Sequence, residues 1–196
     1  MIDRSSDGLE TTDYELIKEC LSGNRDIFAK IVARYKRLIY NTIHNFIGNS
    51  QDTNDLFQEV FLKIYRSLAD YSPDYRFSTW AVRITTNLCL DRLRQKRPEQ
   101  IILDDIAEVR DNRLNPEECY LAQEQQEKIR KAIEALPEEY RVPVILFHQQ
   151  EFSYEEMSEI LGQPMTIIKN RLYRARLMLR DSLISIGGKE SASYDM

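Results

Sequence analysis

The sequence contains few cysteines and no long apolar run, the features that are typical of secreted and membrane-spanning proteins. Its three cysteines, Cys20, Cys89 and Cys119, are widely spaced and form no C-x-x-C pair, which disfavours a disulfide framework or a zinc cluster. No stretch approaches the roughly 18 consecutive apolar residues of a membrane-spanning helix, and residues 1–7 lack the apolar segment of a signal peptide. These absences favour a protein of the reducing cytoplasm that does not itself insert into a membrane.

Glycine and proline are also scarce, with six of each among 196 residues, and long amphipathic patterns lie between them. Apolar residues recur at spacings of three and four, which is typical of helices with one buried face. Because hydrophobic residues make up 42% and charged residues 30%, a core can form and general disorder is not expected. The sequence therefore predicts an all-α protein.

Helix boundaries are predicted from capping residues and helix breakers. In the first half we predict helices at 13–22 after a Thr12 capping box, at 26–48, at 52–68, and from a Ser78 N-cap to residue 97. In the second half we predict a helix at 117–136 and a second one that has Pro137 at its first position and is kinked or ended at Pro143. Two more helices are predicted, one after a capping box at Ser153 and one after an N-cap at Thr166.

The net charge of −5 hides two short cationic stretches. Residues 92–97 carry four cations in six positions, and residues 166–180 carry five cations and no acid. Phosphate backbones respond to such local basic faces rather than to total charge. A solvated helix face explains either stretch alone, but two stretches in two helical units favour a nucleic-acid partner.

An acid-rich segment without periodicity separates the two helical halves. Residues 99–136 hold ten acidic and five basic side chains, and the first part of this range is typical of a linker. We therefore predict two small helical domains joined by an acidic linker, the second being a four-helix domain with a helix-turn-helix. The predicted segments are an extension with a short first helix (1–23), a first domain (24–98), the linker (99–116), a second domain (117–186) and a flexible tail (187–196).

Residues 152–172 combine a capped helix, a glycine, a three-residue turn and a second helix with a cationic face. This order is typical of a helix-turn-helix, whose second helix fits the major groove and reaches base edges through Asn or Arg. Three acids on the first helix would be repelled from the groove, which places that helix above the phosphate backbone. An ordinary αα-hairpin with a basic surface is the alternative.

Three segments carry more specific patterns. Residues 52–65 begin with D-x-x-D-L-x-Q-E-x-F, residues 77–94 begin with F-S-T-W-A and end with D-R-L-R, and residues 136–141 read L-P-E-E-Y-R ahead of the helix-turn-helix. In this order, over roughly residues 20–183, the chain resembles the extracytoplasmic-function (ECF) class of bacterial RNA polymerase sigma factors. Where similar proteins commonly carry Gly-Thr-Val-Lys-Ser-Arg, residues 166–171 read T-I-I-K-N-R, which moves a hydroxyl by one position at a helix N-terminus.

The resemblance implies a sigma factor that binds core RNA polymerase and directs promoter-specific transcription initiation, without catalysis, cofactor, metal or small-molecule substrate. The implied partners are the β′ clamp helices and the β flap of the polymerase, promoter DNA as duplex and as single strand, and an anti-sigma factor. The protein would act at the nucleoid, or be held at the membrane by the anti-sigma factor.

The resemblance also assigns residues to three interfaces. The residues expected to bind core polymerase are Asp52, Asp55, Leu56, Gln58, Glu59 and Phe61. The residues expected to melt and read the −10 element as a single strand are Tyr75, Arg76, Phe77, Thr79, Trp80, Arg83, Asn87, Asp91, Arg92, Arg94, Lys96 and Arg97. The residues expected to read the −35 element as duplex are Thr166, Ile167, Lys169, Asn170, Arg171 and Arg174.

Other interpretations of these residues remain open at this point. Phe77 and Trp80 would serve equally well as core residues that hold the start of a helix. A stand-alone helix-turn-helix regulator would use residues 1–98 for ligand sensing or dimerisation. A helical enzyme would use the acids at 52, 55 and 59 with a metal, although no second acidic motif completes such a site.

Overall fold

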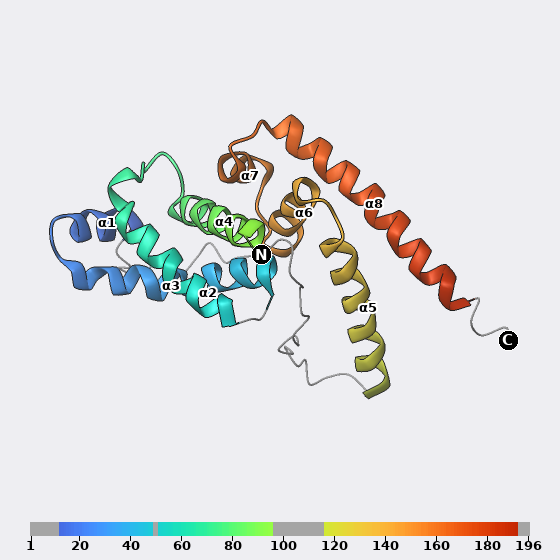
Figure 1. Ribbon diagram of the computed structural model, residues 1–196. Coiled ribbons are helices and arrows are strands. Elements are labelled where there is room, and N and C mark those ends of the chain that lie inside the picture. Colours follow the sequence, from blue (N-terminus) through green and yellow to red (C-terminus); the bar gives the residue numbers. More distant parts are fainter. Residues whose placement is uncertain (1–11, 49–50, 96–115, 192–196) are drawn as a thin grey trace. The chain divides into compact units, whose positions relative to one another are not determined.

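The computed structural model describes residues 12–48, 51–95 and 116–191, and every regular element within these ranges is a helix (Figure 1). The chain divides into two compact units, residues 1–104 and 105–196. The prediction of an all-α protein with two helical domains is therefore confirmed. The predicted linker lies outside the described residues, except for Pro116, with which a helix begins.

The first unit is a bundle of three long helices with a short helix at its side. Its elements are α1 (Asp13–Leu21), the 3₁₀ turn η1 (Arg25–Ile27), α2 (Phe28–Ile47), α3 (Gln51–Arg66), the 3₁₀ turn η2 (Leu68–Asp70) and α4 (Phe77–Gln95). Helix α2 packs against α3 and α4, α3 also packs against α4, and α1 lies against α2 (Figure 1). The apolar face of each helix supplies the core, which includes Leu16, Ile39, Ile43, Val60, Ile64, Ala81 and Cys89.

Local chemistry fixes the helix ends of the first unit. Thr12 and Glu15 form the predicted capping box at the start of α1, and Gly48 ends α2 at a φ of 82°, which a residue with a side chain rarely adopts. The predicted N-cap at Ser78 is wrong. Helix α4 begins at Phe77, the residue before Ser78, and the Trp80 amide donates to the carbonyl of Arg76, so Ser78 lies inside the helix.

The second unit is built around its last and longest helix. Its elements are α5 (Pro116–Glu134), α6 (Glu138–Val144), the π-helical turn η3 (Ile145–Gln149), α7 (Tyr154–Leu161) and α8 (Met165–Ser191). Helix α8 packs against α5, α6 and α7 (Figure 1). Its buried residues Ile168, Leu172 and Ala175 lie on one face and meet a core that includes Val142, Leu146 and Met157.

Two prolines shape the middle of this unit. Pro137 was predicted at the first helical position, but it is the N-cap of α6, which begins one residue later at Glu138. Pro143 lacks the amide hydrogen that a regular helix needs, and the α-helical part ends one residue later, where the wider turn η3 follows. The predicted disturbance at Pro143 is therefore observed as the change from α-helix to π-helical turn.

The helix-turn-helix is formed by α7, a tight turn and α8. Ser153 and Glu156 form the predicted capping box of α7, and Gly162 ends that helix in the left-handed region at a φ of 61°. The predicted N-cap at Thr166 is wrong. The amides of Ile167 and Ile168 both donate to the carbonyl of Pro164, so α8 begins at Met165 and Thr166 lies inside its first turn.

The end of the second unit differs from the prediction. A flexible tail was expected from residue 187, but α8 continues through Gly187 and Gly188 to Ser191. Within the described ranges, no helix is both long and apolar enough to cross a membrane.

The role of the Ser153 capping box in stabilising the helix-turn-helix can be tested by substitution. The change Ser153→Ala removes the acceptor of the Glu156 amide and lowers the stability of the second unit by about 1 kcal/mol. Amide hydrogen exchange in α7 measures this loss. Ser153→Asp keeps an acceptor and is the matched control, so equal exchange in the two variants would contradict the capping role.

Candidate polymerase and nucleic-acid interface

The segment predicted to bind polymerase forms α3, and burial divides it into two groups. Leu56 is 1% exposed and Phe61 is 7% exposed, and the Phe61 ring meets the rings of Phe28 and Phe57. These two predicted interface residues therefore hold α3 in the bundle. The exposed or half-buried members of the predicted set are Asp52, Asp55, Gln58 and Glu59.

The acids of α3 lie on one face because they are three and four positions apart. Leu62 continues this spacing from Asp55 and Glu59, and its side chain is 56% exposed. The resemblance did not single out Leu62, but the same spacing, extended by one turn, finds it. The exposed surface of α3 is thus acidic from Asp52 to Glu59, and its last turns expose Leu62 and the cations Lys63 and Arg66.

Glu59 and Arg92 join α3 to α4 by an ion pair. Arg92 Nη2 lies 3.0 Å from Glu59 Oε2, and the two side chains are 29% and 50% exposed. The resemblance assigned Glu59 to the polymerase surface and Arg92 to the −10 surface. The structure brings them together, so each residue has an intramolecular partner that an external one must replace.

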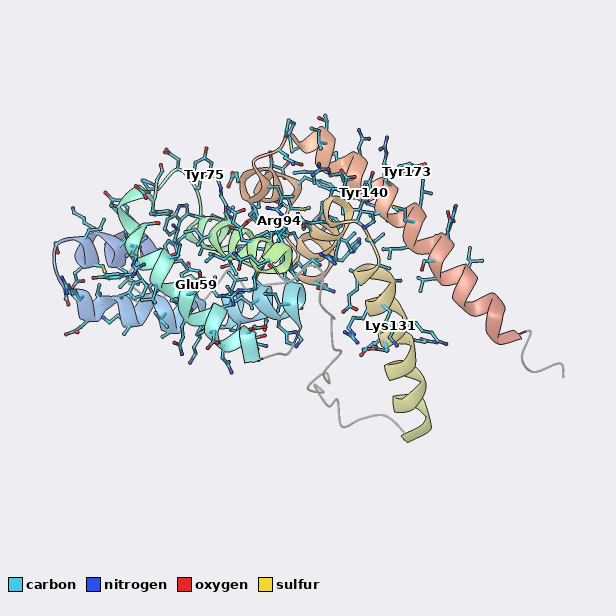
Figure 2. The ribbon with its side chains drawn as sticks, viewed as in Figure 1. Glu59, Tyr75, Arg94, Lys131, Tyr140 and Tyr173 are labelled. Carbon is cyan, nitrogen blue, oxygen red and sulfur yellow. The ribbon has the colours of Figure 1, made fainter. Side chains whose placement is uncertain are left out.

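The loop before α4 and the first turn of α4 carry the aromatic residues predicted to capture single-stranded DNA. Tyr75 is 52% exposed (Figure 2). Arg76, the next residue, is also exposed. Phe77 and Thr79, in contrast, are each 2% exposed. They lie in the core, as the alternative for Phe77 stated, and contribute to this surface only by holding the start of α4. Trp80 is half-buried.

The remaining predicted residues of α4 follow one stripe of the helix. Arg83, Asn87, Asp91 and Arg94 are exposed and are spaced by three or four positions. Arg94 Nη1 lies 3.5 Å from Asp91 Oδ1. Figure 2 shows Tyr75 before the first turn of α4 and Arg94 near the other end, and the stripe covers the part of the helix from Arg83 to Arg94. Lys96 and Arg97 lie outside the described residues.

The residues predicted to read duplex DNA lie in the first three turns of α8. The exposed members are Thr166, Ile167, Lys169, Asn170 and Arg174. The Lys169 ammonium lies 5.3 Å from the centroid of the Tyr154 ring, which stacks on Phe147 at 5.2 Å. This cation–π contact holds Lys169 over the start of α7. Tyr173, 62% exposed and three positions after Asn170, was missed by the sequence analysis (Figure 2).

Arg171 differs from its neighbours because it is engaged within the protein. Its Nη1 donates to Gln163 Oε1 at 2.5 Å, and its Nη2 lies 3.6 Å from Glu139 Oε2. Its side chain is 25% exposed. Arg171 thus ties α8 to the turn before it and to α6, and only part of the guanidinium faces solvent.

Metal-binding groups and reactive thiols were also sought among the described residues. Within them, no group of three or more His, Cys, Asp or Glu side chains could hold a metal ion. Cys20 and Cys89 are buried free thiols, and burial raises the pKa of Cys89 to about 12, so its thiol stays protonated. These two cysteines pack as apolar residues.

Comparison with known families defines the class of this protein. Residues 31–99 match the family described as Sigma-70 region 2, and residues 126–179 match Sigma-70, region 4. The first match covers α3, the loop and α4, and the second covers the helix-turn-helix. The chain therefore has the two domains of a bacterial sigma factor.

Individual relatives narrow the class. The chain is 33% identical to ECF RNA polymerase sigma factor SigW of Bacillus subtilis (strain 168), over 85% of this chain and 94% of the relative. It is 31% identical to ECF RNA polymerase sigma-E factor of Escherichia coli (strain K12), over 85% and 92%. The chain belongs to the ECF sigma factors of bacterial RNA polymerase. This membership sets aside the stand-alone regulator and the helical metalloenzyme.

Solved structures support the same fold. CnrH, in complex with the cytosolic domain of CnrY, is similar with a TM-score of 0.64 and 23% identity, over 87% of this chain and 96% of that chain. The sigma factor RpoE from Bartonella quintana, in complex with the anti-sigma factor NepR, has a TM-score of 0.63 and 20% identity, over 80% and 96%. These likenesses concern the arrangement of helices.

The Glu59–Arg92 ion pair makes a testable prediction about stability. Because both side chains are partly exposed, Glu59→Gln and Arg92→Gln each change the free energy of unfolding by less than about 1 kcal/mol. Chemical denaturation followed by the fluorescence of Trp80, in the same unit, measures this. A larger loss in either variant, or strong coupling in the double variant, would show that the pair stabilises the bundle.

Proposed function

We propose that this ECF sigma factor uses three separate surfaces to bring RNA polymerase to promoters. The acidic face of α3 binds the β′ clamp helices, the loop 71–76 with the exposed stripe of α4 captures the −10 element, and the start of α8 reads the −35 element. The observation that carries the proposal is the exposure of cationic, amide and aromatic side chains on two helices whose opposite faces are buried. Each surface can then meet its ligand without unfolding its unit.

Capture of the −10 element needs groups that hold unpaired bases. Aromatic side chains stack on extruded bases and stabilise each by about 1–3 kcal/mol, which offsets the cost of opening the duplex. The exposed Tyr75 supplies such a ring, and Arg76, Asn87 and Arg94 supply donors for bases. Arg83 and Arg92 would hold phosphates, the latter after separating from Glu59.

Reading of the −35 element uses the duplex major groove. Asn170 is exposed and can reach a base edge, whereas Lys169 and Arg174 suit phosphates. Arg171 contributes by fixing the geometry of the turn through Gln163, and its exposed part can still reach a phosphate. The second unit would meanwhile dock on the β flap, as the family implies.

Regulation of the same surfaces would come from an anti-sigma factor. The similar protein RpoE was solved with the anti-sigma factor NepR, and CnrH with the cytosolic domain of CnrY. A partner of this kind would cover the acidic face of α3 or the cationic face of α8. It would hold the protein away from the nucleoid, and at the membrane where the partner is anchored there.

Transcription in vitro tests the proposed function directly. Purified chain is combined with bacterial core polymerase and a pool of native promoter fragments, and transcripts are sequenced. Transcripts that start at a common promoter sequence, and only when the chain is present, are expected. Failure to copurify with core polymerase would contradict the proposal.

The polymerase surface is tested by a charge reversal on α3. Asp55→Arg places a cation in a face that should meet a basic groove, so binding to core polymerase should fall by at least about ten-fold while helix content stays unchanged. Copurification and circular dichroism measure the two effects. Asp70→Arg, which reverses an exposed acid of η2 in the same unit, is the matched control. Equal binding by both variants would count against the α3 surface.

The −35 surface is tested by separating base contacts from phosphate contacts. Asn170→Ala should lose about 1–3 kcal/mol of discrimination between intact and scrambled −35 elements. Lys169→Ala should weaken binding to both DNAs alike and lower the salt dependence by about one ion. Holoenzyme binding to the two DNAs at several salt concentrations measures this. Arg180→Ala, further along α8 beside Asp181, is the control, and a loss equal to that of Asn170→Ala would refute the assignment.

A further inference from the structure

A chain of polar and aromatic contacts connects the short helix α1 to the loop that precedes α4. It begins at Asp13, whose two carboxylate oxygens both bind α2. Arg34 Nη1 lies 2.6 Å from Asp13 Oδ1, and Tyr35 Oη donates to Asp13 Oδ2 at 2.5 Å. The capping box at Thr12 holds Asp13 in the first turn of α1. Two consecutive residues of α2 are thus fixed by one carboxylate.

Tyr35 carries the connection into the bundle. Its ring lies 4.9 Å from the ring of Phe77, the first residue of α4, at an interplanar angle of 58°. Burial, and then the hydrogen bond to Asp13, raise the pKa of the Tyr35 hydroxyl, which therefore remains a protonated donor. A phenylalanine would bury the same ring area but would lack the bond to Asp13. The hydroxyl therefore contributes the direction of the ring rather than apolar burial.

Tyr71 closes the chain at the loop. Its ring meets Phe77 edge-on at 5.4 Å and Trp80 at 5.5 Å, and Phe77 and Trp80 also contact each other. Its hydroxyl donates to the carbonyl oxygen of Tyr75 at 2.7 Å. This bond fixes the peptide that joins Tyr75 to Arg76. The contacts from Asp13 to Tyr75 therefore form one continuous path through packed side chains.

We propose that Asp13 and Tyr35 are positioning residues for the capture of unpaired bases. Helix α1 fixes Tyr35, Tyr35 orients the aromatic cluster of Phe77, Tyr71 and Trp80, and this cluster sets the loop peptide that presents Tyr75 and Arg76. The proposal rests on the proposed function of the loop in binding single-stranded DNA. It assigns to α1 a role in promoter opening without any contact between α1 and DNA.

Removal of single groups along the path tests the proposal. The full-length chain is assembled with core polymerase, and the probe is a labelled single-stranded oligonucleotide that the unsubstituted holoenzyme selects from a random pool. Tyr35→Phe and Asp13→Ala should each weaken binding of this probe about ten-fold, the size of one hydrogen bond to a charged group. Affinity for core polymerase should not change. Tyr40→Phe, an exposed tyrosine of the same helix outside the path, should bind the probe normally.

Coupling along the path separates positioning from a general structural role. In a Tyr71→Phe background, where the last hydrogen bond is gone, Asp13→Ala should cause no further loss of probe binding. Additive losses would overturn the proposal. Trp80 is the single tryptophan of the chain, so its emission reports on the cluster directly. Tyr35→Phe should shift this emission, and an unchanged spectrum would also overturn the proposal. Because Tyr35→Phe keeps the ring, it carries the test if Asp13→Ala does not fold.

Two loop variants keep this test distinct from that of the proposed function. Tyr75→Ala and Arg76→Ala should weaken probe binding whatever the role of α1. If they do so while Tyr35→Phe and Asp13→Ala bind normally, only the positioning role is overturned. If the loop variants bind normally, the capture function of the loop fails, and the positioning role fails with it.

Discussion

Packing of one face of a helix decides what its other face can bind. Phe77, Ala81 and Cys89 bury one side of α4, and the polar stripe from Arg83 to Arg94 must then face solvent. The same constraint acts on α8, where a buried apolar row turns the cationic residues outward. Both candidate DNA surfaces thus follow from the cores beneath them, since moving a core residue by one position would rotate the exposed row by about 100°.

Acidic side chains lie close to several cations of the candidate surfaces. Arg92 pairs with Glu59, Arg94 lies near Asp91, and Arg171 lies near Glu139. Such exposed pairs cost little to separate, but they hold long side chains in defined directions before a ligand arrives. An acidic protein can therefore present local cationic surfaces without a strong general attraction for nucleic acid. Specific contacts then decide where it binds.

Sequence patterns predicted the helices well because caps and apolar spacing act locally. The boxes at Thr12 and Ser153 formed as expected. The errors at Ser78 and Thr166 are alike, since in both places the helix begins one residue before the hydroxyl, and the carbonyls of Arg76 and Pro164, two residues earlier, accept the first helical bonds. A hydroxyl near a helix start indicates a cap but does not fix its position.

The residues of the candidate interfaces were predicted less completely, because a sequence motif gives the residue type at each position but not whether its side chain is buried. Leu56, Phe61, Phe77 and Thr79 belong to the recognised patterns, yet they are buried and support the surface from below. Tertiary partners such as the one Arg171 finds in Gln163 come from residues eight positions away. No local pattern contains that information.

Neighbouring residues of α8 have different roles, and this difference affects which substitutions the protein can accept. Asn170 faces outward, so under the proposed function an exchange there would alter which promoters are chosen while the fold tolerates it. Arg171 holds the turn through Gln163, so an exchange there would disturb the start of α8 itself. A change of promoter choice then needs substitutions only at a few exposed positions of α8, while the contacts that orient this helix stay the same.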